Sequence, residues 1–254
     1  AGRSFSDAAQ VSGNVIENRS YRIEVAGRGA ITSLIDRTQG SRELARTIND
    51  LGPGAGTLAV ENAGPVSVTL RATAAGPPAH TTRITLLRDK DRIEIRNDIT
   101  QNFADVQTWS FAFNFEAPDL WHEEVGAVIR AKLLADGGHY SPRNARYDWL
   151  TLNHFASLCD ASRGRGVILS NADCAFMKFG NSTVRHLDTR TAQLSVLAGG
   201  QVDGPRLGIP RQGGATHFTQ RFALQGCSSF RAAQAMRFAL EHQIAQIALS
   251  HINH

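Results

Sequence analysis

The chain has 254 residues, of which 42% are hydrophobic and 20% are charged, a balance that excludes intrinsic disorder and is typical of a globular protein. No window approaches about 18 consecutive apolar residues, so the sequence predicts no membrane-spanning helix and no membrane partner. The formal net charge of +4 comes from basic residues that alternate with acids, as in residues 88–92, which favours a solvated surface and argues against a nucleic-acid partner.

Period-two alternation of apolar and polar residues dominates the chain and predicts β-strands. Tyr21, Ile23 and Val25 alternate with polar residues before a glycine turn at 27–29 that returns the chain to Ile31. The later strands are predicted at Val66–Leu70, 84–88 and 92–99 (a hairpin around 89–91), Trp109–Phe115, 166–170, 194–197 and 217–224. Trp109, Phe111, Phe113 and Phe115 share one face, so all four rings are expected to point into the core.

One stretch, at about 228–249, is predicted to be helical, with Ser228 or Ser229 as the N-terminal cap. Its apolar positions at helical spacing are Ala233, Met236, Leu240, Ile244 and Ile247, a face expected to pack on a sheet. Segments 50–56, 136–146 and 199–214 are rich in Gly and Pro and are predicted loops. We therefore expect one domain over residues 1–254, a large sandwich of two antiparallel sheets with one C-terminal helix.

The three cysteines, Cys159, Cys174 and Cys227, are odd in number and have no C-x-x-C spacing. This argues against a disulfide scaffold and a thiolate metal site, and it favours a reducing, cytoplasmic location. Ala1 begins the chain without a Met or a leader pattern. We therefore expect a processed start or a piece of a longer protein.

The acidic residues form no recognisable acid/base pair by spacing, and 122–124 lacks the second His of an H-E-x-x-H helix. No phosphate-cradling Gly loop, dinucleotide fingerprint or G-x-S-x-G turn is present. His251 and His254 place two imidazoles three positions apart, which is more typical of a solvated tail than of a metal site. The sequence alone therefore predicts no catalytic residues, no metal site and no cofactor in this chain.

Eight phrases, in order and spacing, resemble the C-terminal β domain of glycoside hydrolase family 38, the α-mannosidases. They are IENRSYRIEV (16–25), GAITSLID (29–36), GSREL (40–44), RIEIRNDI (92–99), SLCD (157–160), GRGVILSN (164–171), LSVL (194–197) and HFTQRFAL (217–224). The resemblance covers residues 14–225, and it implies a galactose mutarotase-like β super-sandwich.

In that family the nucleophile and the zinc ligands lie upstream, in a catalytic domain that this chain lacks. The resemblance thus implies a non-catalytic domain that supports this upstream catalytic domain, contacts carbohydrate, takes part in mannose metabolism and is inactive by itself. The alternatives are a free-standing mutarotase-like epimerase, or a carbohydrate-binding or structural module. In the epimerase, His154, in a phrase that resembles the mutarotase Asn-His-aromatic strand, would be the acid and Glu241 the base.

Carbohydrate contacts are expected from aromatic faces and planar polar groups on loops. The loop at 139–143, which leads to Tyr147 and Trp149, offers both, and the pair after Pro118 is the second choice. The candidate contact residues are His139, Tyr140, Arg143, Trp149, Trp121 and His122.

Overall fold

The computed structural model describes residues 8–160, 162–200 and 214–252, with backbone alone for 245–252. These residues form nineteen β-strands, one short 3₁₀ helix (η1) and one α-helix, and they divide into two compact units. Unit 1 comprises Ala1–Asn114 and Val196–Arg221, and unit 2 comprises Phe115–Ser195 and Phe222–His254. The strand β18 (Gln193–Gly199) and the strand β19 (Phe218–Cys227) have residues in both units.

Unit 1 contains two antiparallel sets of strands. The first set runs in the order β1-β2-β3-β4-β6-β11, with β5 paired to β4, and the second in the order β10-β9-β8-β7. Their bounds are β1 Gln10–Ser12, β2 Val15–Glu17, β3 Tyr21–Val25, β4 Ile31–Asp36, β5 Arg42–Glu43, β6 Ala45–Asp50, β7 Gly56–Ala63, β8 Ser67–Ala74, β9 His80–Leu87, β10 Ile93–Ile99 and β11 Gln107–Phe113. The predicted hairpin is confirmed, because Ile93 of β10 pairs with Leu86 of β9.

The core of unit 1 follows the alternation in the sequence. In β3 every second residue is buried, because successive side chains of a strand point to opposite faces. Trp109, Phe111 and Phe113 are at most 1% exposed, and Phe115 of unit 2 is 7% exposed, so the predicted burial of all four rings is confirmed. The prediction for Val66 was wrong: it precedes β8 and is 62% exposed.

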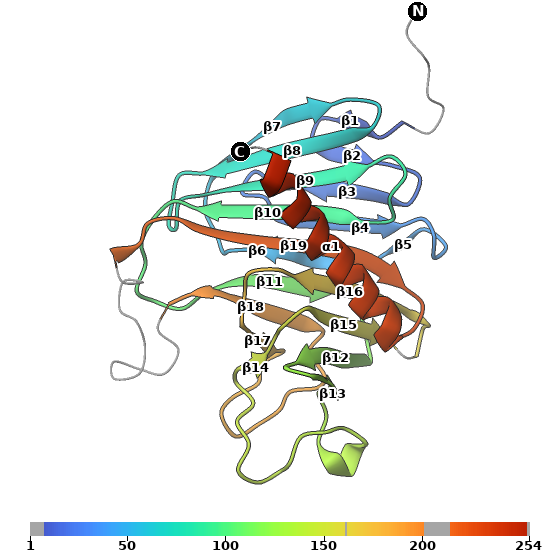
Figure 1. Ribbon diagram of the computed structural model, residues 1–254, viewed down its shortest axis with the longest axis vertical. Helices are drawn as coiled ribbons and strands as arrows, with labels where there is room; N and C mark the ends of the chain where they lie inside the picture. The colour runs from blue at the N-terminus through green and yellow to red at the C-terminus, as the bar shows by residue number, and fades with distance from the viewer. Residues whose placement is uncertain (1–7, 161, 201–213, 253–254) are drawn as a thin grey trace, which may run out of the picture. The chain divides into compact units, whose positions relative to one another are not determined.

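Unit 2 also contains antiparallel strands of two sets. One runs in the order β13-β12-β15-β16-β19, and the other contains β18, β17 and β14. The bounds are β12 Pro118–Glu124, β13 Ala127–Arg130, η1 Leu134–Asp136, β14 Leu150–Thr151, β15 Phe155–Asp160, β16 Arg165–Asn171 and β17 Phe176–Phe179. Every residue of β15 and β16 is buried, and helix α1 (Ala232–Ile252) packs against both strands (Figure 1).

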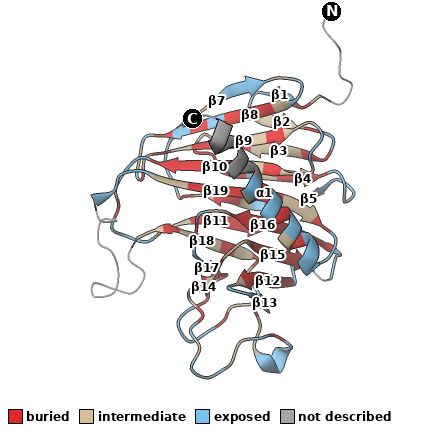
Figure 2. Ribbon diagram, viewed as in Figure 1, coloured by how far each residue is buried: buried red, intermediate tan, exposed pale blue. Residues whose placement is uncertain are grey.

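The predicted helix exists, but its start and its buried face differ from the prediction. It begins at Ala232, so neither Ser228 nor Ser229 is its cap, and the backbone N–H of Ala235 bonds to the carbonyl of Arg231. Of the predicted face, Ala233, Leu240 and Ile244 are exposed, Met236 is half-buried, and the side chain of Ile247 lies outside the described residues. The buried positions are Ala235, Phe238, Ala239 and His242, and Figure 2 shows exposed residues along the outer face of α1.

Burial of His242 explains the difference in helix face. Its Nδ1 lies 2.9 Å from Oγ of Ser170 in β16, so a polar side chain belongs to the buried face. A histidine interrupts the apolar periodicity of a helix face, so the sequence pattern predicts a solvent-facing side chain at this position.

The predicted loops at 50–56 and 136–146 lie almost wholly outside strands, and most of the loop predicted at 199–214 falls outside the described residues. None of the helices in the described part of the chain is long and apolar enough to cross a membrane. The predicted fold class is confirmed: mainly β, in antiparallel sheets, with one C-terminal helix. The single domain over 1–254 stays a prediction.

Candidate functional site in unit 2

Strand β12 of unit 2 carries most of the chemistry that the structure assembles. Alternating strand geometry sends Trp121 and Glu123 to one face of the strand and His122 and Glu124 to the other. Loop and strand residues from 139–154 then meet these side chains on both faces. The result is three contact groups around β12.

The first group pairs Glu123 with His154. Oε2 of Glu123, which is 4% exposed, lies 2.8 Å from Nδ1 of His154, and the amide of Asn153 donates to Oε1 at 3.2 Å. Burial raises the pKa of Glu123, but hydrogen bonds from the backbone and ring of His154 and from Asn153 outweigh it and lower the pKa. A carboxylate only accepts, so the contact with Glu123 requires a hydrogen on Nδ1 of His154.

His154 also lines a cleft of about 370 Å³. The other lining residues are Val125, Thr151, Leu152, Asn153, Asn171, Ala172, Asp173, Cys174, Ala175 and Gln243. An imidazole that is oriented by a buried carboxylate and borders a cleft of this size has the elements of a general acid or base.

The second group joins His122, Tyr140 and Glu124. Nδ1 of His122 lies 2.8 Å from the carbonyl of Thr151, and Nε2 lies 3.2 Å from the hydroxyl of Tyr140, which donates to Glu124 at 3.0 Å. Burial lowers the pKa of His122, so the ring is neutral at neutral pH. Burial raises the pKa of Tyr140, and the charge of Glu124 raises it further. Because His122 is completely buried, this group is held by contacts within the chain.

The third group surrounds the ring of Trp121. Phe230 stacks on Trp121 with 4.7 Å between ring centroids, the guanidinium of Arg130 lies 5.6 Å from the centroid, and His139 meets the ring edge-on at 5.9 Å. Arg130 donates to Asp119 at 2.9 Å, and Lys132 lies 3.1 Å from the same carboxylate. Burial raises the pKa of Asp119, but the hydrogen bonds and charges of Arg130 and Lys132 outweigh it and lower the pKa.

The structure thus brings four of the predicted carbohydrate contacts together as two pairs and leaves two apart. Trp121 contacts His139 on one face of β12, and His122 contacts Tyr140 on the other. Arg143 is exposed on its loop, and half-buried Trp149 lies under the ammonium group of Lys178 at 5.3 Å. These residues stay predicted contacts, because no carbohydrate complex tests them.

In the alternative catalytic pair, the structure gives His154 a partner other than the predicted Glu241. Glu241 is exposed on α1, whereas Glu123 bonds to His154. Sequence reasoning missed Glu123, since 31 positions separate it from His154 and no short motif links them.

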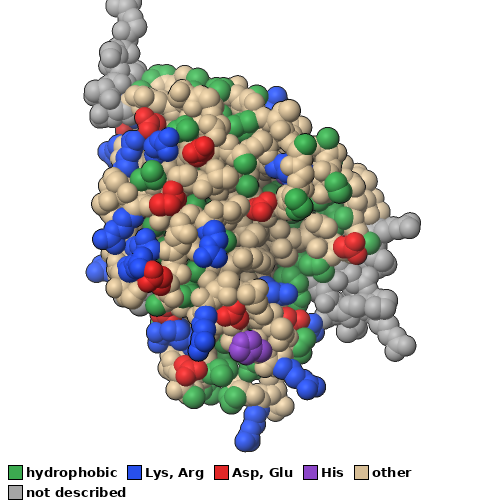
Figure 3. Space-filling model, turned by 180° about the vertical axis from the view of Figure 1, so that it is seen from behind, with side chains coloured by type: hydrophobic (Ala, Val, Ile, Leu, Met, Phe, Trp, Pro, Cys, Tyr) green, Lys and Arg blue, Asp and Glu red, His purple; other side chains and the backbone are tan. Residues whose placement is uncertain are grey.

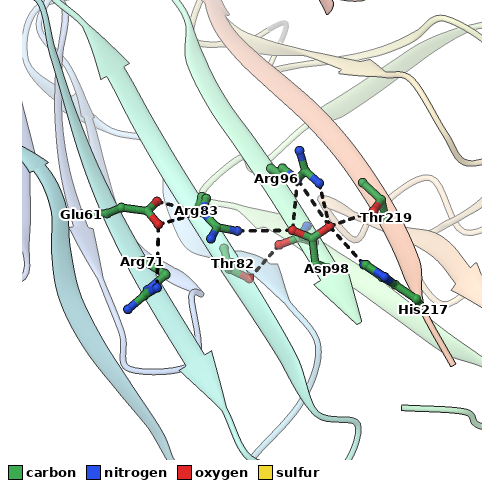
Figure 4. Close-up of polar contacts among 9 residues, drawn as sticks. Glu61, Arg71, Thr82, Arg83, Arg96, Asp98, His217 and Thr219 are labelled. Carbon is green, nitrogen blue, oxygen red and sulfur yellow. Dashed lines mark hydrogen bonds and ion pairs between the residues drawn. The ribbon is translucent and has the colours of Figure 1, made fainter. Parts of the chain in front are cut away.

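Unit 1 carries a separate polar network on β9, β10 and β19, shown in Figure 4. Asp98 accepts from Arg96 at 3.0 Å, from Thr219 at 2.8 Å and from Arg83 at 3.4 Å, and His217 lies 3.7 Å away. Burial raises the pKa of Asp98, but these bonds, led by that of Arg96, outweigh it and lower the pKa. With its oxygens occupied by four neighbours, this carboxylate links strands.

No three His, Cys, Asp or Glu side chains gather to hold a metal ion in the part of the chain that the structure describes. The zinc implied by the resemblance belongs to the upstream catalytic domain, so the absence of a cofactor from this chain stays a prediction. The paired imidazoles His251 and His254 lie outside the described side chains. All three cysteines are free thiols, and Sγ of Cys159 lies 3.9 Å from Sγ of Cys227. On the face shown in Figure 3, basic and acidic side chains are interspersed.

No family model and no curated protein matches the chain. Among solved structures, it superposes over 95% of its length on an α-mannosidase from Enterococcus faecalis V583, with a TM-score of 0.69 and 11% identity, and covers 32% of that chain. A glycosyl hydrolase family 38 protein from Enterococcus faecalis matches with a TM-score of 0.66 and 11% identity. This match covers 95% of the present chain and 34% of the Enterococcus chain. A galactose mutarotase related enzyme from Lactobacillus acidophilus has a TM-score of 0.47 and 13% identity. This match covers 84% of the present chain and 97% of the Lactobacillus chain.

At 11% identity, the first two matches show a shared fold. The chain spans about a third of the length of these two solved structures. The fold of this chain is therefore shared with about a third of each of these two longer chains.

Proposed function

We propose that the chain is the C-terminal β domain of an α-mannosidase-like glycoside hydrolase. In this role it supports an upstream catalytic domain, which carries the nucleophile and the zinc, and it lends carbohydrate contacts from unit 2. One observation carries the proposal: 95% of the chain superposes on about a third of an α-mannosidase at a TM-score of 0.69. The ordered sequence phrases over residues 14–225 support the same family. The free thiols support a reducing compartment such as the cytoplasm.

The state of the buried carboxylates in unit 2 supports a non-catalytic role. Glycoside hydrolysis takes a proton donor and a nucleophile or base that face the same sugar. Here Asp119 is held by Arg130 and Lys132, and Glu123 by His154 and Asn153. Asp160 accepts from Ser162 and from the backbone of Glu116. Because their partners lower the pKa of each, these carboxyl groups are poor proton donors at neutral pH.

Hydrolysis of a chromogenic aryl α-mannoside tests this proposal. The chain by itself is expected to hydrolyse none above background. The protein translated from the complete native reading frame is expected to hydrolyse it. The length of that reading frame is an independent observation, because a short frame would favour a free-standing module.

A mutarotase-like epimerase is the second candidate, and the Glu123–His154 pair beside the 370 Å³ cleft favours it. Such an enzyme opens the sugar ring by moving protons at the ring oxygen and the anomeric hydroxyl. Polarimetry of glucose or galactose anomerisation separates the candidates. Acceleration that is lost in both His154→Ala and Glu123→Gln but kept in Glu241→Gln would establish the epimerase with the structural pair.

A further inference from the structure

A second cleft of unit 2, with a volume of about 540 Å³, lies between two loops that Figure 1 shows at the same end of the unit. The loop after β13 contributes Leu133, Asp136, Pro142 and Tyr147, and the loop between β17 and β18 contributes the run from Arg185 to Arg190. This volume is within the range of about 300–1,000 Å³ that small-molecule sites occupy. None of the residues predicted to contact carbohydrate lines it.

The loop between β17 and β18 is folded around one carboxylate. Asp188 accepts the backbone N–H groups of Asn181 and Arg190 at 2.8 and 2.9 Å, and its own N–H donates to Oγ of Ser182. Burial raises the pKa of Asp188, but these bonds outweigh it and lower the pKa to about 2. Gly180 makes the fit possible, because a Cβ there would lie 2.6 Å from Oδ2 of Asp188. The cleft wall is thus preorganised without a ligand.

The opposite wall is also held by contacts within its own loop. Leu133 and Tyr140 form a bridge, and the hydroxyl of buried Tyr147 donates to the carbonyl of Ser141 at 2.5 Å. Leu133, Pro142 and Tyr147 give this wall an apolar component. Two fixed loops therefore face each other across a polar cleft.

The polar groups of the cleft suit a neutral ligand with many hydroxyls. Arg185 and Arg190 are exposed, and within the described part of the chain neither guanidinium has a hydrogen-bond or ion-pair partner. Their two positive charges are balanced by Asp136 and Asp188, so the lining has no formal net charge when its histidine is neutral. The two guanidinium donors and the carboxylate acceptor of Asp136 together match vicinal hydroxyls, whereas a phosphate would require a net positive lining.

We propose that this cleft is a binding site for a neutral oligosaccharide that contains mannose, with Arg185 and Arg190 donating to its hydroxyls. The choice of mannose rests on the proposed function, and the choice of a neutral sugar rests on the balanced charges. The apolar wall at Pro142 and Tyr147 contacts the C–H face of a pyranose ring. The cleft holds the sugar without cutting it.

Titration of the 254-residue chain with α-linked mannobiose, followed by calorimetry and by saturation-transfer NMR, tests the site. Arg185→Ala and Arg190→Ala are each expected to raise the Kd by about tenfold, since each removes charge-assisted hydrogen bonds. Arg237→Ala is the matched control, because Arg237 is an exposed arginine on α1 and does not line the cleft. Asp136→Asn removes an acceptor from the facing loop and provides a second, independent variant.

Three outcomes would overturn the proposal: no mannobiose binding by the parent chain, an unchanged Kd in Arg185→Ala, Arg190→Ala and Asp136→Asn, or binding of inorganic phosphate in place of mannobiose. Far-UV circular dichroism and the urea midpoint of each variant check that the fold is kept. The mannoside hydrolysis assay does not depend on this cleft. If the cleft binds no mannobiose, the proposed function is unaffected. If the isolated chain hydrolyses the mannoside, the proposed function is contradicted and the cleft proposal is unaffected.

Discussion

Glu123 and His154 are joined by a 2.8 Å contact between Oε2 and Nδ1 across 31 positions of sequence. The carboxylate is buried, and the half-buried imidazole borders a cleft of about 370 Å³. The pair thus links a buried residue of β12 to a residue that reaches the surface. Its removal affects stability and carboxylate ionisation whether or not the pair is catalytic.

His154→Ala is expected to raise the pKa of Glu123 and to destabilise the fold by about 1–3 kcal/mol, because a buried carboxylate loses one of its two side-chain donors while that of Asn153 remains. The folded-state pKa of Glu123 is lowered, so its stabilising effect is present above the ordinary value of 4.5 and is lost as the pH falls through the folded value. Carboxyl ¹³C NMR and urea unfolding measure both effects. His186→Ala, at an exposed ring, is the control, and an unchanged pKa of Glu123 would contradict the pairing.

Asp188→Asn is expected to cost about 2 kcal/mol at neutral pH, since Asp188 has a pKa of about 2 in the fold against an ordinary value of 3.8. The lowered pKa means that the stabilisation is complete well above 3.8 and disappears as the pH falls towards 2. Urea unfolding at a series of pH values should show the difference between parent and variant shrink over that interval. Asp105→Asn, at an exposed site, should show no such trend, and a difference independent of pH would refute the assignment.

Phe113→Ala is expected to destabilise the chain by about 3–5 kcal/mol, because the ring is 1% exposed and its loss leaves a cavity. Phe176→Ala removes a ring that is 41% exposed and should cost much less. Chemical unfolding of both variants makes the comparison. Equal costs would mean that the register of β11 is wrong.

Gly166→Ala is expected to destabilise by about 1–3 kcal/mol through overpacking. Gly166 pairs with both Cys159 and Cys227, and a Cβ there would lie 2.7 Å from Sγ of Cys159 and 2.9 Å from the carbonyl of Leu158. Gly64→Ala is the control, because the nearest atom to its Cβ would be 3.6 Å away. If thermal unfolding shows the same midpoint for both variants, the close packing of β15, β16 and β19 is incorrect.

The strands could be predicted from sequence because their alternation is local: Tyr21, Ile23 and Val25 alone define the buried face of β3. The helix face could not, because His242 is buried through a hydrogen bond to Ser170, 72 positions away. The same limit applies to the candidate site. Glu123 and His154, and the two loops around Tyr147 and Asp188, meet through tertiary contacts that leave no fixed spacing in the sequence.

Hydrolysis of an aryl α-mannoside by the protein from the complete native reading frame, with the 254-residue chain assayed beside it, tests the central claim most directly. The account predicts mannosidase activity in the complete protein and none above background in the chain alone, because the carboxylates of unit 2 are held by neighbouring groups. Hydrolysis by the chain alone, or a complete protein without α-mannosidase activity, would contradict it.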